Sequence, residues 1–148
     1  KISPALREKI MLGVTSITDC RLCQWGHTHW AMAKGVPLDE VNRILGSEVE
    51  ALKALDPAEA AAILFARHYA ENLDRIDPES LANQRLHFSD AEAAEILAYV
   101  RTITLGSLTG NTLDAVFGRL RRPRGVESDN APTSTKRSRD HQEREERR

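Results

Sequence analysis

Helix-start signals recur along this chain, and they constrain its fold more than any other feature of the sequence. Ser3, Asp56 and Asp77 each directly precede a proline. Proline is favoured at the first position of a helix, because its missing N–H would have no partner there and its φ is already helical. Ser and Asp side chains accept hydrogen bonds from the free amides of a first turn. Each of these pairs therefore predicts the start of an α-helix.

The N-terminal third of the chain predicts three helices. Apolar residues repeat at helical spacing after Ser3, which predicts a first helix from Pro4. Thr18 and Asp19 are candidate caps of a second helix, which Gly35 ends. A short third helix is expected from about Leu38 to Leu45, closed by Gly46.

The rest of the body continues in the same way. An alanine-rich fourth helix follows Asp56 and reaches about Leu73, and another follows Asp77. The run Ser89-Asp-Ala-Glu92 has the form of a capping box and predicts a further helix. Gly106 and Gly110 are candidate break points in that helix, with Asn111 as the cap of a final piece.

An alternating strand pattern is missing from the body, and only 5 % of the 148 residues are aromatic. The chain is long enough for one domain with a modest core. We therefore expect a single all-α helical domain over residues 1–120. No fixed-period repeat is present.

Residues 121–148 are expected to form a disordered, charged tail. This segment has almost no apolar residues and cannot bury enough surface to fold. It holds nine Lys or Arg against six Asp or Glu, a charge of +3, which leaves −4 on the body. Because the acidic residues are interleaved with the basic ones, a solvated tail is favoured over a nucleic-acid contact.

Composition also bears on the cellular setting. No run of about 18 apolar residues exists, so no membrane span is expected. The chain shows no signal-peptide pattern, and its two cysteines do not form a secreted disulfide scaffold. We therefore expect a cytoplasmic protein whose cysteine pair cycles between dithiol and disulfide.

Both cysteines and two of the five histidines lie within ten residues, Cys20 to His29. If Cys20 begins the second helix, then Cys20, Cys23 and His27 lie on one helical face. Helix-start amides favour the thiolate, and His27 is close enough to accept or return its proton. A thiolate attacks peroxides and disulfides, and the product needs a second nearby thiol. The pattern therefore fits two-cysteine redox chemistry.

Two other interpretations of the cluster remain open. A structural zinc site could use both cysteines, His27 and His29, but His29 lies about 200° around the helix from His27. The cysteines could also be small apolar residues packed in a helix. Other aromatic and histidine residues that we expect to have no catalytic role are Trp25, Trp30, His68 and His87.

The motif Cys20-x-x-Cys23-x-x-x-His27 resembles the AhpD-like branch of the carboxymuconolactone decarboxylase family. Matching residues that follow the motif are Ala31, Ala33-Lys34-Gly35 and Leu38-Asp39-Glu40-Val41. The family also has a glutamate twelve residues before the first cysteine, and Glu8 holds that position here. Leu22 departs from the pattern, because this branch commonly carries Tyr or His between the cysteines.

The resemblance implies an AhpD-like helical bundle, a homo-oligomer (trimer or hexamer) and peroxiredoxin-like alkylhydroperoxide reductase activity. It also implies that Glu8 and His27 relay protons to the cysteines. The partners would be a peroxide substrate and a dithiol or protein reductant. No metal or organic cofactor is required.

Our hypothesis is that Cys23 attacks a peroxide and Cys20 resolves the product into a Cys20–Cys23 disulfide. The position of His27 favours Cys23 as the nucleophile, whereas the helix start favours Cys20. The alternatives are the family's lactone decarboxylation, in which thiols have no evident part, a non-enzymatic helical oligomerisation module and a metal-binding regulator.

Overall fold

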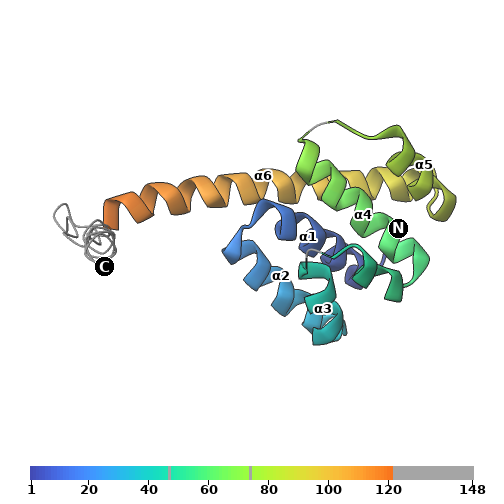
Figure 1. The fold of residues 1–148 in the computed structure, drawn as a ribbon, viewed down its shortest axis with the longest axis horizontal. Helices are drawn as coiled ribbons and strands as arrows, with labels where there is room; N and C mark the ends of the chain where they lie inside the picture. Colours follow the sequence, from blue (N-terminus) through green and yellow to red (C-terminus); the bar gives the residue numbers. More distant parts are fainter. Residues whose placement is uncertain (47, 74, 122–148) are drawn as a thin grey trace, which may run out of the picture. The chain divides into compact units, whose positions relative to one another are not determined.

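The computed structural model describes residues 1–46, 48–73 and 75–121, and within them every regular element is a helix (Figure 1). The elements in chain order are α1 (Pro4–Thr18), α2 (Arg21–Ala33), α3 (Leu38–Leu45), the 3₁₀ helix η1 (Glu50–Ala54), α4 (Pro57–Asn72), α5 (Pro78–His87) and α6 (Asp90–Arg121). The predicted all-α fold class is confirmed. The short η1 carries no cap or periodic signal in the sequence, so it is missing from the predicted elements.

The chain divides into two compact units, Lys1–Phe117 and Gly118–Arg148. The first unit contains the described helices up to Phe117, and everything below concerns this unit. The predicted disordered tail, residues 121–148, lies outside the described residues from residue 122 onward.

The three predicted cap–proline pairs all begin helices, and each capping side chain accepts a hydrogen bond from a first-turn amide. These bonds are Leu6 N–H to Ser3 Oγ at 3.1 Å, Ala58 N–H to Asp56 Oδ1 at 2.9 Å and Ser80 N–H to Asp77 Oδ2 at 2.8 Å. Ser89 and Glu92 also bond each other's backbone amides, which completes the predicted capping box. Local hydrogen bonding therefore accounts for these four starts.

The predicted start of α2 is wrong. Thr18 is the last residue of α1, and Asp19 closes that helix in the left-handed conformation, with φ 49°. Asp adopts this conformation more readily than most residues. Cys20 is the N-cap of α2 and makes no side-chain capping bond. Gly35, with φ 86°, follows the end of α2 as predicted.

The predicted break in α6 is also wrong, because the helix runs through Gly106 and Gly110 without interruption. A glycine inside a helix costs about 1 kcal/mol relative to alanine, which packing elsewhere in the helix can offset. Asn111 caps nothing in α6. Its side-chain amide donates instead to the carbonyl of Thr18 at 2.6 Å.

Helix α1 lies between two apolar clusters (Figure 1). In the first cluster α1 packs against α4 and α6, through Leu6, Ile10, Val14, Phe65, Ala66, Ile96, Val100 and Ile103. In the second it packs against α2, α3, η1 and α4, through Leu12, Ala31, Val41, Ile44, Leu52 and Ile63. One helix therefore supplies side chains to both halves of the core.

A buried cation links α1 to two other helices. Lys9 is 7 % exposed, and its ammonium forms ion pairs with Glu40 of α3 and with Glu59 of α4, the latter at 2.6 Å. Burial lowers the pKa of Lys9, but the two carboxylates outweigh it and raise that pKa overall. The charge of Lys9 thus holds α3 and α4 against α1.

We predict that Gly13→Ala destabilises the fold by about 1–3 kcal/mol, because α4 lies close against α1 there and an added Cβ would overpack the contact. A Cβ on Gly13 would lie 3.1 Å from Ile63 Cγ2 and 3.4 Å from the Ile63 carbonyl. The free energy of unfolding in denaturant measures the effect. Gly106→Ala is the matched control, because no described atom lies within 4 Å of the added Cβ. A Gly13→Ala protein as stable as wild type would contradict this account of the contact.

Candidate dithiol site

Cys20 and Cys23 are joined by a disulfide, with their Cα atoms 5.2 Å apart. Cys20 is the N-cap of α2, and Cys23 lies in the first turn of that helix. The three-residue spacing brings the two sulfurs to one side of the helix start. The structure thus places the two predicted cysteines together.

The two sulfurs differ in accessibility. Cys20 is only 2 % exposed, whereas Cys23 is half-buried and packs against the first core cluster. A reagent from solvent therefore reaches Cys23 more easily than Cys20.

Glu8 and His27 are also brought together, from two different helices. His27 Nδ1 lies 2.8 Å from Glu8 Oε2, and the two residues are 8 % and 4 % exposed. The other oxygen of Glu8 accepts a hydrogen bond from Arg7 Nε at 3.2 Å. Burial of a carboxylate is costly unless it is paired, and these two contacts give each oxygen of Glu8 a partner. When His27 Nδ1 donates to Glu8, its Nε2 is left able to accept a proton.

Arg7 in turn is held by Tyr99 of α6. Its guanidinium lies 5.7 Å from the centre of the Tyr99 ring. The Tyr99 phenol raises the pKa of Arg7, burial opposes this, and Glu8 raises it further. Arg7 therefore stays charged beside Glu8.

An open pocket of about 440 Å³ borders the Glu8–His27 pair. Its lining includes Arg7, Glu8, Met11, His27, Trp30 and Tyr99. The Trp30 ring also contacts His27 edge-on, with 5.1 Å between ring centres. The pocket combines apolar walls with two groups able to exchange protons, while the disulfide lies outside its lining.

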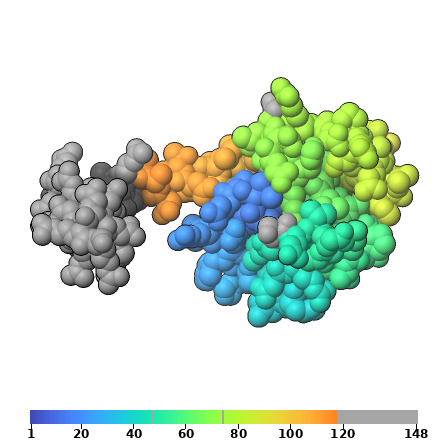
Figure 2. Space-filling view, in the orientation of Figure 1, coloured from blue at the N-terminus to red at the C-terminus, as the bar shows by residue number. Residues whose placement is uncertain are grey.

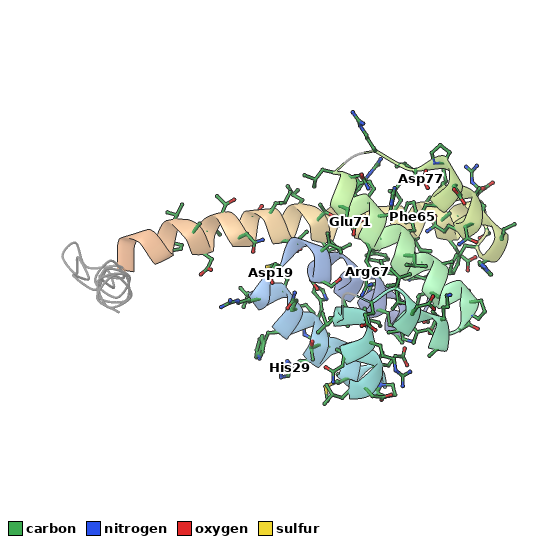
Figure 3. All side chains as sticks on the ribbon, viewed as in Figure 1. Asp19, His29, Phe65, Arg67, Glu71 and Asp77 are labelled. Atoms are coloured by element: carbon green, nitrogen blue, oxygen red, sulfur yellow. A yellow bond between two sulfur atoms is a disulfide. The ribbon has the colours of Figure 1, made fainter. Side chains whose placement is uncertain are left out.

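His29 is not part of this arrangement. It lies on the outer side of α2, where it is exposed and its Nδ1 donates to the Trp25 carbonyl at 2.7 Å (Figure 3). Among the residues that the structure describes, no group of three or more His, Cys, Asp and Glu side chains could hold a metal ion. Like His29, Trp25 and Leu22 are exposed, at 63 % and 73 %.

No helix among the residues that the structure describes is long and apolar enough to cross a membrane.

A second cavity, of about 410 Å³, contains none of the predicted site residues and is lined by Arg67, His68 and Glu71 of α4 (Figure 3). Arg67 is 5 % exposed and donates to the carbonyls of Ile44 and Gly46, at the C-terminus of α3. Burial lowers its pKa, and Glu71 opposes that shift. The charge of Arg67 therefore serves to hold α3 on α4.

Helix α6 contributes to the site through Gly110 and Asn111, which were not among the predicted site residues. A Cβ on Gly110 would lie 3.3 Å from Cys20 Sγ and 3.9 Å from Cys23 Sγ. Asn111, the next residue, bonds the carbonyl of Thr18, two residues before Cys20. A glycine inside a helical pattern signals a close approach as well as a break, and here it marks the approach.

No protein-family model, curated protein or solved structure matches this chain. The likeness to the AhpD-like branch therefore rests on Glu8 and on the Cys20 to Glu40 motif alone.

Proposed function

We propose that the chain is a peroxiredoxin-like thiol peroxidase in which Cys20 and Cys23 reduce a hydroperoxide and a dithiol or protein reductant restores them. The observation that carries the proposal is the buried Glu8–His27 contact, one helical turn from a disulfide-bonded Cys-x-x-Cys pair. A purely structural disulfide needs no proton-transferring neighbour. A catalytic one does, because thiols lose protons when they react and regain them when they are reduced.

In the first step the Cys23 thiolate attacks the terminal oxygen of the peroxide. An S–O bond forms and the O–O bond breaks, so that Cys23 becomes a sulfenic acid. The departing alkoxide takes a proton and leaves as an alcohol. We assign this step to Cys23 because it is the more exposed sulfur.

In the second step the Cys20 thiolate attacks the sulfur of the Cys23 sulfenic acid. The S–S bond forms, the S–O bond breaks, and the departing hydroxide takes a proton to become water. Overall, two thiols and one hydroperoxide give a disulfide, an alcohol and water. A dithiol reductant then gives two electrons and two protons to the pair and becomes a disulfide itself. We place this cycle in the cytoplasm, where thiols are kept reduced.

The role proposed for His27 is to take the Cys23 proton before attack and return it to the leaving group. Glu8 holds Nδ1, which orients the ring and leaves Nε2 for the transfer. The pocket beside His27 offers Met11, Trp30 and Tyr99 to the alkyl group of the peroxide. The AhpD-like resemblance supports the same assignment of Glu8, Cys20, Cys23 and His27.

We also propose that the chain forms a homo-oligomer, and that a second copy covers the C-terminal half of α6. Large apolar residues on this stretch are at least 44 % exposed: Leu105, Leu108, Leu113, Val116 and Phe117. Figure 2 shows that part of α6 (orange) extending beyond α1 and α2 (blue). An apolar helix stripe of this length is typical of a surface that a partner buries.

One equivalent of cumene hydroperoxide should remove both thiols of the reduced wild-type protein, because one turnover forms the disulfide. Thiol titration and mass spectrometry measure the result. Cys20→Ser should still consume one equivalent and stop at the sulfenic acid, whereas Cys23→Ser should consume none. Unchanged thiols in the wild type would refute the peroxidase proposal, and the reverse behaviour of the two variants would make Cys20 the nucleophile.

Glu8→Gln should slow peroxide consumption by roughly 10- to 100-fold, because a neutral amide no longer holds His27 as a base. Stopped-flow measurement of peroxide loss gives the rate, and circular dichroism checks that the variant is folded. Glu50→Gln, at an exposed residue of η1, is the matched control and should react like wild type. A Glu8→Gln rate equal to wild type would remove Glu8 from the relay.

Sedimentation velocity should show an oligomer of the wild-type chain, and Leu113→Glu combined with Phe117→Glu should dissociate it, since charges on the apolar stripe cannot be buried unpaired. Leu86→Glu, at an 80 % exposed position of α5, is the control and should leave the assembly intact. A monomeric wild type at tens of micromolar would exclude this assembly.

A further inference from the structure

Helix α6 touches the disulfide at a glycine. A Cβ placed on Gly110 would lie 3.3 Å from Cys20 Sγ, closer than nine in ten Cβ contacts, and 3.9 Å from Cys23 Sγ. Four residues earlier in the same helix, no described atom lies within 4 Å of a Cβ on Gly106. The missing side chain at Gly110 thus leaves the space against the sulfurs that any other residue would fill.

The residue after Gly110 holds the backbone that carries the sulfurs. Asn111 Nδ2 donates to the carbonyl of Thr18 at 2.6 Å, across 93 residues of sequence. Thr18 ends α1, Asp19 makes the left-handed turn, and Cys20 begins α2. One point on α6 therefore contacts both the sulfurs and the turn that presents them.

We propose that Gly110 and Asn111 are positioning residues that set the dithiol–disulfide equilibrium of Cys20 and Cys23. Gly110 leaves the room that the bonded sulfurs occupy, and Asn111 keeps the turn where the two sulfurs meet. The meaning of this control for catalysis rests on the proposed function, but the equilibrium itself does not.

The close approach of residue 110 is to the bonded sulfurs, because the structure holds the disulfide. A methyl group on residue 110 would lie 3.3 Å from Cys20 Sγ, so that the sulfur or α6 must move by a few tenths of an ångström. The bond to Cys23 limits how far Cys20 Sγ can turn away, whereas a free thiol can rotate about its Cα–Cβ bond. The added methyl group therefore disfavours the disulfide and shifts the equilibrium toward the dithiol.

Asn111 supports the disulfide through the backbone. An intramolecular disulfide is favoured when the fold holds its two thiols at a high effective concentration. The Asn111–Thr18 bond fixes the turn that ends at Cys20, so its loss lets Cys20 move relative to Cys23. Asn111→Ala should therefore shift the equilibrium toward the dithiol.

The experiment equilibrates the full-length chain with mixtures of reduced and oxidised dithiothreitol. Oxidised dithiothreitol takes two electrons and two protons from the cysteine pair as the protein disulfide forms. Acid quenching, alkylation of free thiols and mass spectrometry then give the ratio of disulfide to dithiol. Gly106→Ala is the control for Gly110→Ala. Thr109→Ala is the control for Asn111→Ala, because Thr109 is exposed and bonds only the Leu105 carbonyl of its own helix.

We expect Gly110→Ala to lower the equilibrium constant for disulfide formation by about three- to tenfold, the effect of modest overpacking on one of two states. Asn111→Ala should lower it by about the same factor, the loss of one positioned hydrogen bond. Both controls should stay within about twofold of wild type. Gly106→Ala changes the helix propensity of α6 as Gly110→Ala does, so a difference between these two variants measures the contact with the sulfurs.

Wild-type values for both Gly110→Ala and Asn111→Ala would overturn the proposal, as would equal shifts in Gly110→Ala and Gly106→Ala. If Gly110→Ala fails to fold by circular dichroism, Asn111→Ala against Thr109→Ala decides alone. No peroxide enters these measurements. A wild type inert to peroxide would therefore refute the proposed function while leaving this result standing.

Discussion

The burial of α1 imposes pairing on every charge that the helix carries into the core. Glu8 and Lys9 are consecutive residues, both at most 7 % exposed, and an unpaired charge at such depth would be costly. Lys9 is matched by carboxylates of α3 and α4, and Glu8 by His27 of α2. The arrangement of three helices around α1 therefore depends on these polar pairings as well as on apolar contact.

The same requirement connects stability with the proposed chemistry. Glu8 cannot lie where it does without a partner on α2, and the partner it has is the residue one turn after Cys23. Replacement of the pair by apolar residues could preserve the packing, as it often does for buried ion pairs. Such a core would lose the buried imidazole of His27, one helical turn after Cys23. The proposed proton transfer by His27 would explain why the fold buries Glu8 in spite of the cost.

Local signals predicted much of the fold. Ser3, Asp56, Asp77 and Ser89 begin helices as expected, because each cap is satisfied by amides two or three residues away. The start of α2 and the continuity of α6 were predicted wrongly. Both depend on contacts between distant segments, and the bond from Asn111 to Thr18 is the clearest of them. The sequence around Asn111 predicts a helix cap, and no pattern in it shows that this side chain bonds the last carbonyl of α1 instead.

The site residues also differ in whether a local sequence pattern predicts them. The pairing of Cys20 with Cys23 follows from their spacing on one helix, and so does the position of His27. Glu8 has no such local signal, since a carboxylate in α1 would ordinarily face solvent, and only the family resemblance pointed to it. A glycine at position 110 is compatible with a helix break or with a close approach of another segment, and the sequence alone does not distinguish the two.

The two glycines of α6 have a further consequence for slow motions of the chain. Each lowers the helix stability by about 1 kcal/mol relative to alanine, and they lie one turn apart on either side of Leu108. Unwinding that starts toward the C-terminal end of the helix therefore meets its weakest stretch beside the disulfide. Amide protons there should exchange with solvent sooner than those near Ile96. A sulfur that is covered in the average structure is then uncovered by brief local openings, and these would admit the protein reductant of the proposed cycle.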